Sequence, residues 1–133
     1  MPTTIIPASW AGPLQAALRI MTGLLFVQHG TAKLLKFPVT DMFKDGVQLF
    51  SLMGVAGVLE LVGGIFIIVG FQTRITAFVL AGFMAVAYFM AHAPSGLFPI
   101  LNFGELAIMF CFVFLYLAAA GAGPYSVDNG AKA

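Results

Sequence analysis

Ionisable side chains interrupt the long apolar stretches of this sequence and are its first candidates for chemistry. They lie inside these stretches or at their ends: Arg19, His29, Lys33, Glu60, His92 and Glu105. In a membrane, a charge is costly unless it meets a partner or faces a cavity. Each of these residues is therefore a candidate functional residue if the stretches cross a membrane.

Arg19 and Glu60 form the first pair that we predict. At a rise of about 1.5 Å per residue, Arg19 lies roughly 9 Å and Glu60 roughly 14 Å below the same side of the membrane, where the first stretch begins and the second ends. A guanidinium can bind a carboxylate bidentately, which makes both charges tolerable. We expect a structural ion pair that fixes two helices in register, or else two polar residues that line a ligand cavity.

A second group of polar residues falls near the opposite end of the stretches: His29, Lys33, His92, Asn102 and Glu105. His29 and Lys33 are four residues apart, and Asn102 and Glu105 are three apart, so each pair shares a helix face. Three helices would thus bring imidazole, carboxylate, ammonium and amide groups to one level. We predict that these residues bind a ligand, with His29 and Glu105 as candidate catalytic groups.

Each member of this group also has a structural explanation. Lys33 can extend its ammonium group to the lipid headgroups, and His92 can cap a helix end. Asn102 can be the N-cap of the last helix, with Glu105 at the third helical position of a capping box. The functional alternatives are a metal site, a proton relay, and a pocket for a quinone or phenol.

These functional alternatives need different surroundings. Imidazole and carboxylate suit several transition metals, but no HxxxH or ExxH spacing occurs in the sequence, and we predict no metal site. A proton relay would use a histidine that titrates near neutral pH beside a glutamate in a dry place. A quinone or phenol pocket needs hydrogen-bonding groups and aromatic walls. Nearby rings could form such walls: Phe26, Tyr88, Phe89 and Phe103.

The composition identifies the class of protein that holds these residues. Of 133 residues, 61% are hydrophobic and only 8% are charged, whereas a soluble domain carries about 25% charged residues. The net charge of +1 provides no field that would attract nucleic acid. The single cysteine, Cys111, excludes an intramolecular disulfide and a CxxC pair. We therefore expect an integral membrane protein in contact with the lipid bilayer.

Four apolar stretches are long enough to cross a bilayer as helices. Their approximate bounds are residues 14–36, 47–70, 73–93 and 101–120. Short connections make consecutive helices antiparallel neighbours, so we predict an all-α integral membrane protein with an antiparallel four-transmembrane-helix bundle. Residues 1–133 would form a single domain, and the many small residues along the helices would also permit a homo-oligomer.

Four spans would place both termini on one side of the membrane. The basic residues near the span ends divide evenly between the two sides: Arg19, Arg74 and Lys132 against Lys33, Lys36 and Lys44. The positive-inside rule therefore barely decides the orientation. We expect cytoplasmic termini because Arg74 lies in a tight turn, whereas the lysines on the opposite side are interleaved with acidic residues.

Several short motifs occur in order along the chain. They are R...G...HG..KL in residues 19–34, G-x-x-E-x-x-G-G followed by G-x-x-T-R in residues 57–74, His92 after the third apolar stretch, Asn102-Phe103-Gly104-Glu105, and G-x-G-x-x-S-x-D in residues 121–128. Together they resemble the DoxX family of small four-span bacterial membrane proteins. The likeness covers about residues 18–128.

The resemblance implies a protein of the bacterial inner membrane and an association with redox chemistry near quinone. The family takes its name from a subunit of a terminal quinol oxidase. Since the sequence shows no flavin, haem or iron–sulfur motif, we expect no covalent cofactor and a redox partner that is another protein. Phe103 stands where the family's N-G-G-E motif has its first glycine, and it would narrow a pocket beside Glu105 or add a stacking wall.

Three functions are compatible with these features. The first is a component of a membrane redox system that binds a quinone or similar small hydrophobic ligand inside the bundle and has no enzymatic activity alone. The second is a non-catalytic scaffold or maturation factor that recruits soluble redox proteins. The third is an oligomeric small-molecule transporter, although no pair of discontinuous helices marks a transport site.

Overall fold

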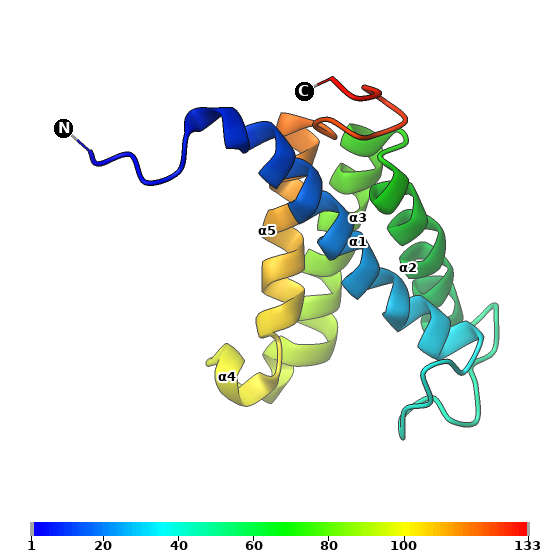
Figure 1. The fold of residues 1–133 in the computed structure, drawn as a ribbon. Helices are drawn as coiled ribbons and strands as arrows, with labels where there is room; N and C mark the ends of the chain where they lie inside the picture. Colours follow the sequence, from blue (N-terminus) through cyan, green and yellow to red (C-terminus); the bar gives the residue numbers. More distant parts are fainter. Residues whose placement is uncertain (1, 133) are drawn as a thin grey trace.

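The described part of the chain is helical. The computed structural model describes residues 2–132 (Figure 1). The four longest helices are α1 (Ala11–Leu34), α2 (Leu52–Val69), α3 (Thr73–Ala87) and α5 (Glu105–Ala120), and α4 (Pro99–Asn102) is a single short turn. Within residues 2–132 no strand forms, and the one β-bridge joins Ser126 to Gly130. The expectation of an all-helical protein is confirmed.

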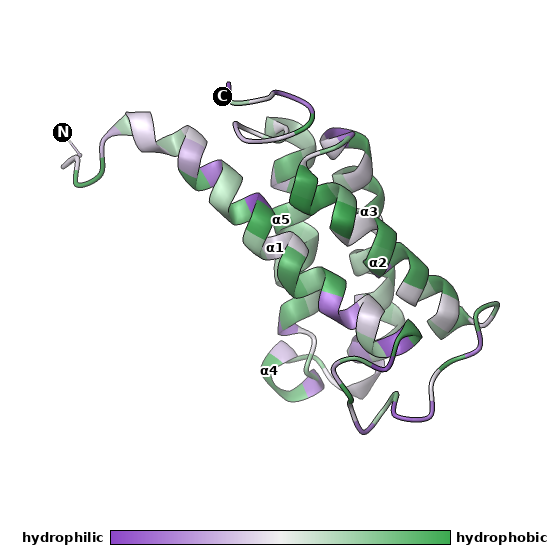
Figure 2. Ribbon diagram, turned by 45° about the vertical axis from the view of Figure 1, so that its right-hand side comes forward, coloured by the Kyte–Doolittle hydropathy of each residue, from purple (hydrophilic) through white to green (hydrophobic). Residues whose placement is uncertain are grey.

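Three of the helical segments are long and apolar enough to cross a membrane. They comprise residues Ala8–Leu34, Leu52–Val69 and Thr73–Ser95, whereas Glu105–Ala120 is apolar but shorter. Figure 2 shows that the helices are mainly hydrophobic and that hydrophilic residues gather in loops and at helix ends. The protein therefore has three to four candidate membrane-spanning helices.

The helix boundaries differ from the predicted spans where local hydrogen bonds or backbone geometry intervene. α2 begins at Leu52 rather than at residue 47, because the Ser51 hydroxyl accepts a hydrogen bond from the Gly54 N–H at 3.1 Å. After α3 the chain continues through a π-helical turn, η2 (Tyr88–His92), and a 3-10 turn, η3 (Ala93–Ser95). The last long helix starts at Glu105 rather than at residue 101, because Phe103 adopts a left-handed conformation (φ 61°).

α1 packs closely against α2 because glycines remove the side chains between them. A Cβ atom at Gly30 would lie 2.6 Å from the backbone nitrogen of Leu61, and one at Gly23 would lie 2.6 Å from Cγ1 of Ile68. These contacts bring Gly30 beside Leu61 and Gly23 beside Ile68, so the two helices run antiparallel. Contacts this close fix the register between the two helices.

Phe26 joins this helix pair to α3 and α5. Its side chain is fully buried, and its ring lies edge-on to Phe110 and Phe114 of α5, with centroid separations of 5.2 and 5.0 Å. The core around it is apolar and contains Ile67, Ala77, Leu80, Ala81, Met84 and Leu117. Phe26 is therefore a core residue, and its predicted place in a pocket wall is wrong.

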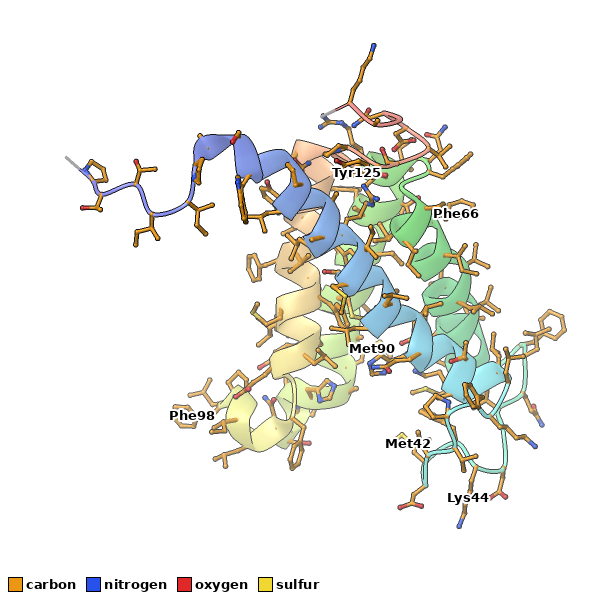
Figure 3. The ribbon with its side chains drawn as sticks, in the orientation of Figure 1. Met42, Lys44, Phe66, Met90, Phe98 and Tyr125 are labelled. Carbon is orange, nitrogen blue, oxygen red and sulfur yellow. The ribbon has the colours of Figure 1, made fainter. Side chains whose placement is uncertain are left out.

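The chain after α5 crosses the ends of the helices as a C-terminal strap (residues 121–130). Arg19 of α1 is fully buried and donates hydrogen bonds to the carbonyl oxygens of Ala122, Pro124 and Tyr125 in this strap. The strap N–H groups of Val127 and Asp128 donate to Val69 O and Gly70 O, each at 2.9 Å. Tyr125 marks the strap in Figure 3, at the end of the molecule opposite Lys44 and Phe98.

Asp128 of the strap caps the first turn of α3. Its carboxylate accepts hydrogen bonds from the backbone N–H groups of Gln72 at 2.8 Å and Thr73 at 2.9 Å. Partial burial acts to raise the pKa of Asp128, but these hydrogen bonds and the nearby Arg19 charge outweigh burial and lower that pKa below its ordinary value. The folded state therefore favours the charged carboxylate.

Replacing Gly30 by alanine tests the close packing of α1 on α2. The added methyl group would overlap the α2 backbone, so we expect Gly30→Ala to lower the free energy of unfolding by about 1–3 kcal/mol. Gly82→Ala is the matched control, because a Cβ atom at this α3 position meets nothing within 4 Å. Thermal unfolding in detergent micelles measures both variants. Equal stability of the two would contradict the packing described above.

Asp128→Asn tests the strap cap. An amide is a weaker acceptor for the α3 N–H groups, so we expect a loss of about 1 kcal/mol in stability at pH 7. Because the folded-state pKa is lowered, the wild-type contribution is complete above the ordinary aspartate pKa of about 4 and is lost as the pH falls through the folded-state value. Unfolding curves from pH 3 to 7 should converge for the two proteins at the acid end. Asp45→Asn, in an exposed loop, is the control.

Candidate functional site

The structure divides the predicted ligand-binding residues among separate places. Lys33 pairs with Glu60 between α1 and α2, and His92 hydrogen-bonds to Asn102 beside α4. Glu105 lies exposed at the start of α5. The five residues that the sequence placed in one group, His29, Lys33, His92, Asn102 and Glu105, therefore do not form a single cluster.

Lys33 and Glu60 form a buried ion pair. The Lys33 Nζ atom lies 2.7 Å from Oε1 of Glu60, and both side chains are buried. This contact replaces the predicted Arg19–Glu60 pair, which is wrong. A lysine at the end of α1 thus reaches inward to a carboxylate and not outward to lipid headgroups.

The register of α1 and α2 explains why Arg19 misses Glu60. A Cβ atom at Gly70 would lie 3.2 Å from the Arg19 guanidinium carbon, so Arg19 is level with the residue that follows α2. The level of Glu60 is that of Gly30, which is eleven residues or roughly 16 Å further along α1. The predicted depths placed the start of the first span and the end of the second at one membrane edge, whereas α1 extends past the end of α2 (Figure 1).

Phe43 lies against the Lys33–Glu60 pair, and Phe110 lies against His29, the residue one turn before Lys33. Phe43, from the loop after α1, lies 4.9 Å from the Lys33 Nζ atom, measured to the ring centroid, within the range of a cation–π contact. His29 lies one turn before Lys33, and its ring stands perpendicular to that of Phe110 at 6.1 Å. The His29 Nε2 atom is buried and has no hydrogen-bond partner within residues 2–132.

Tyr88, His92 and Asn102 form a second polar group, which we call the Tyr88–His92–Asn102 cluster. The buried Asn102 amide donates from Nδ2 to the Tyr88 hydroxyl at 3.1 Å and accepts at Oδ1 from the Gly104 N–H at 2.8 Å. The His92 Nδ1 atom lies 2.9 Å from the Asn102 carbonyl oxygen. The His92 and Tyr88 rings are stacked, with centroids 6.3 Å apart.

Asn102 and Glu105 do not form the predicted capping box. Asn102 is the last residue of α4, and Glu105 is the first residue of α5, whose N-cap is Gly104. The left-handed Phe103 separates the two short helical ends, so the amide of Asn102 bonds within the turn and does not cap α5. The capping-box interpretation is wrong for this reason.

Glu105 borders a groove of its own. The groove has a volume of about 470 Å³ and is lined otherwise by Pro99, Ile100, Phe103, Leu106 and Met109. Phe103 is 83% exposed, so its ring lines this groove beside Glu105 rather than the core. Nothing in residues 2–132 joins the Glu105 carboxylate to the Tyr88–His92–Asn102 cluster by a hydrogen bond or ion pair.

Sequence reasoning missed two parts of this arrangement. The first is the hydrogen bond from the Asn102 amide to the Tyr88 hydroxyl, a residue that the sequence suggested only as an aromatic wall. The spacing of four residues between Tyr88 and His92 signals that their rings share a helix face, but nothing in the sequence signals the bond to Asn102. The second is the contact of Phe43 with Lys33. Phe43 lies in a loop, where no helical periodicity indicates which residue its ring contacts.

Lys33→Met tests the buried pair. Removing the ammonium leaves the Glu60 carboxylate buried without a partner, so we expect destabilisation of about 3–5 kcal/mol. The double variant Lys33→Met/Glu60→Met removes both charges and should recover most of that loss. Urea or thermal unfolding measures both, with Lys44→Met in the exposed loop as control. A double variant as unstable as the single one would contradict an ion pair.

Comparison with known proteins identifies the family of this chain. The DoxX family model matches residues 14–93. A Haemophilus influenzae protein whose name states no function is 45% identical over 117 residues, covering 86% of this chain and 87% of its own. The Escherichia coli K12 protein named "Inner membrane protein YqjF" is 34% identical over 121 residues, covering 84% of this chain and 86% of its own.

A third relative is more distant. The Bacillus subtilis protein named "Putative oxidoreductase CatD" is 27% identical over 112 residues, covering 84% of this chain and 81% of its own. No solved protein structure matches the chain significantly. The family match, the identities to relatives over most of the chain and the apolar helices agree with the motifs quoted above. This chain is a membrane protein that belongs to the DoxX family.

Proposed function

We propose that this protein is a component of a membrane redox system and binds a quinone or similar small hydrophobic ligand at the Tyr88–His92–Asn102 cluster. α1, α2, α3 and α5 would cross the inner membrane as an antiparallel bundle with cytoplasmic termini. The single observation that carries the proposal is the chemistry of the cluster. Asn102 holds a phenol and an imidazole side by side at the end of an apolar helix.

The residues of the cluster fit the ligand class. A quinone head group is a flat ring with two oxygens, so its site needs aromatic walls and hydrogen-bonding groups. Tyr88 and His92 are both half-buried and supply hydrogen-bonding groups, and the exposed ring of Phe89 stands perpendicular to Tyr88 with centroids 5.4 Å apart. When bound, a quinone would supply the two-electron chemistry, and this chain would bind and orient it.

The position of the cluster supports access from lipid. It follows α3, at the end of the molecule opposite the C-terminal strap (Figure 1), and the side chains around it include many exposed apolar residues such as Phe89, Met90 and Phe98. A hydrophobic ligand dissolved in the bilayer could reach the cluster without crossing water. Electrons would pass to another redox protein. A redox role is in keeping with the name of the CatD relative.

Binding to the purified protein tests the proposal. In lipid nanodiscs, isothermal titration with decylubiquinone should show saturable binding. Tyr88→Phe should weaken it about tenfold, because the loss of one hydrogen bond costs about 1.4 kcal/mol. Glu105→Gln, in the separate groove, is the control and should bind as the wild type does. Absence of saturable binding of both decylubiquinone and its reduced form, decylubiquinol, to a folded wild-type protein would refute the proposed ligand class.

A scaffold that recruits redox proteins is the second candidate. It is favoured by the way the buried charged groups find partners inside the chain: Lys33 on Glu60, and Arg19 on the strap. Groups that are paired in this way stabilise the fold and need no ligand. For a scaffold, Tyr88→Phe and His92→Phe variants that accumulate normally should still co-purify with the same redox proteins as the wild type.

A further inference from the structure

Building on the proposed function, we infer that the Tyr88–His92–Asn102 cluster selects the dihydroxy (quinol) form of its ligand over the dicarbonyl (quinone) form. Asn102 acts as the positioning residue for this selection. The inference follows from the direction of each hydrogen bond in the cluster. It concerns which redox form is bound, and so goes beyond the proposal that a quinone-type ligand binds at all.

The orientation of the Asn102 amide is the first step. A backbone N–H can only donate, so the atom that receives the Gly104 N–H at 2.8 Å must be the amide oxygen. The other amide atom is then the NH₂ group. It has two acceptors, the Gly96 carbonyl oxygen at 3.0 Å and the Tyr88 hydroxyl at 3.1 Å. Both amide protons are therefore used, and the amide cannot turn over.

The second step concerns the Tyr88 hydroxyl. Because its oxygen accepts from Asn102, its own proton is not needed for that contact. Within residues 2–132, no acceptor forms a hydrogen bond with this proton. Tyr88 therefore presents an O–H donor to a ligand.

The third step concerns His92. The Asn102 carbonyl oxygen can only accept, so the Nδ1 atom 2.9 Å away carries a proton. In the neutral imidazole the remaining nitrogen, Nε2, then holds a lone pair and is an acceptor. His92 is half-buried, and no donor in residues 2–132 bonds to its Nε2 atom. The cluster thus combines one donor, from Tyr88, with one acceptor, on His92.

A hydroxyl group matches this combination and a carbonyl group does not. A quinol hydroxyl can donate its proton to His92 Nε2 while its oxygen accepts from Tyr88. A quinone carbonyl can accept from Tyr88 but has no proton for His92, so two lone pairs would face each other. Sites built to bond a hydroxyl discriminate strongly against analogues that lack it. For this half-buried cluster we expect a preference of about 10- to 100-fold.

Gly104 shows how closely the cluster is held. A Cβ atom there would lie 2.5 Å from Cε1 of the Tyr88 ring and 2.8 Å from Oδ1 of Asn102. The turn between α4 and α5 therefore presses directly on both residues. The Tyr88 ring and the Asn102 amide therefore have little room to move away from the positions that place the Tyr88 hydroxyl beside Asn102.

The experiment compares pairs of related ligands of which one carries the hydroxyl proton and the other lacks it. Titration of the wild type in nanodiscs uses 4-heptylphenol and its methyl ether, which avoid redox chemistry, and then decylubiquinol and decylubiquinone under anaerobic conditions. We expect the hydroxyl form to bind about 10- to 100-fold more tightly in each pair. His92→Phe, which keeps an aromatic ring without the acceptor, should reduce the ratio to about one while the ether still binds.

Tyr88→Phe and Asn102→Asp distinguish positioning from mere stability. The carboxylate introduced by Asn102→Asp keeps the acceptor for the Gly104 N–H but accepts the proton of the Tyr88 hydroxyl, which is then no longer offered to the ligand. Both variants should therefore weaken the binding of the phenol and of its ether by the same factor and leave the ratio of the two affinities unchanged. Because both act through the same hydroxyl, the double variant should be no weaker than either single one. Additive losses would overturn the role of Asn102.

The outcomes separate this inference from the proposed function. Equal binding of hydroxyl and carbonyl forms by the wild type would overturn the selectivity while leaving a quinone site in place. Absence of binding by both forms would overturn the proposed function itself. A preference that persists in His92→Phe would show that His92 is not the acceptor and would also overturn the inference.

Discussion

The close approach of α1 to α2 is the constraint on which the placement of the charged side chains depends. Gly30 and Gly23 allow no slippage, since a single Cβ atom at either position would collide with α2. That register brings Lys33 within 2.7 Å of Glu60 and leaves Arg19 level with the turn after α2. In a medium without water, a charge must find a partner in the protein. Each of these charges finds the partner that the register allows.

Arg19 is paired with backbone carbonyl oxygens and not with a carboxylate, and the C-terminal strap supplies these oxygens. The chain after α5 offers carbonyl oxygens that are not used in a helix, and a buried guanidinium can donate to several of them at once. In return the strap supplies Asp128 to the free N–H groups at the start of α3. Three motifs that are distant in the sequence, at positions 19, 70–74 and 121–128, thus hold the strap across the same ends of the helices.

Much of this arrangement could be predicted from the sequence, and the errors have specific causes. Composition and apolar length predicted helices and their order, because burial in lipid requires them. The pairing of Glu60 was mispredicted because depth was counted from span edges, and the edges of α1 and α2 do not coincide. The placement of Asn102 was mispredicted because a phenylalanine in a left-handed conformation, Phe103, breaks the last helix where its residue type gives no warning.

The break at Phe103 also explains why the hydrogen-bond donors and acceptors of the Tyr88–His92–Asn102 cluster have fixed positions. Irregular backbone near the end of a membrane span leaves N–H and C=O groups that the protein itself must satisfy. Asn102 bonds to Gly104 and Gly96, and His92 bonds to the Asn102 carbonyl. These bonds use one nitrogen of the imidazole and one amide proton, and the second amide proton goes to the Tyr88 hydroxyl. They therefore leave a defined donor on Tyr88 and a defined acceptor on His92. The donor and the acceptor on which the proposed ligand binding depends are thus a consequence of how the helix break is stabilised.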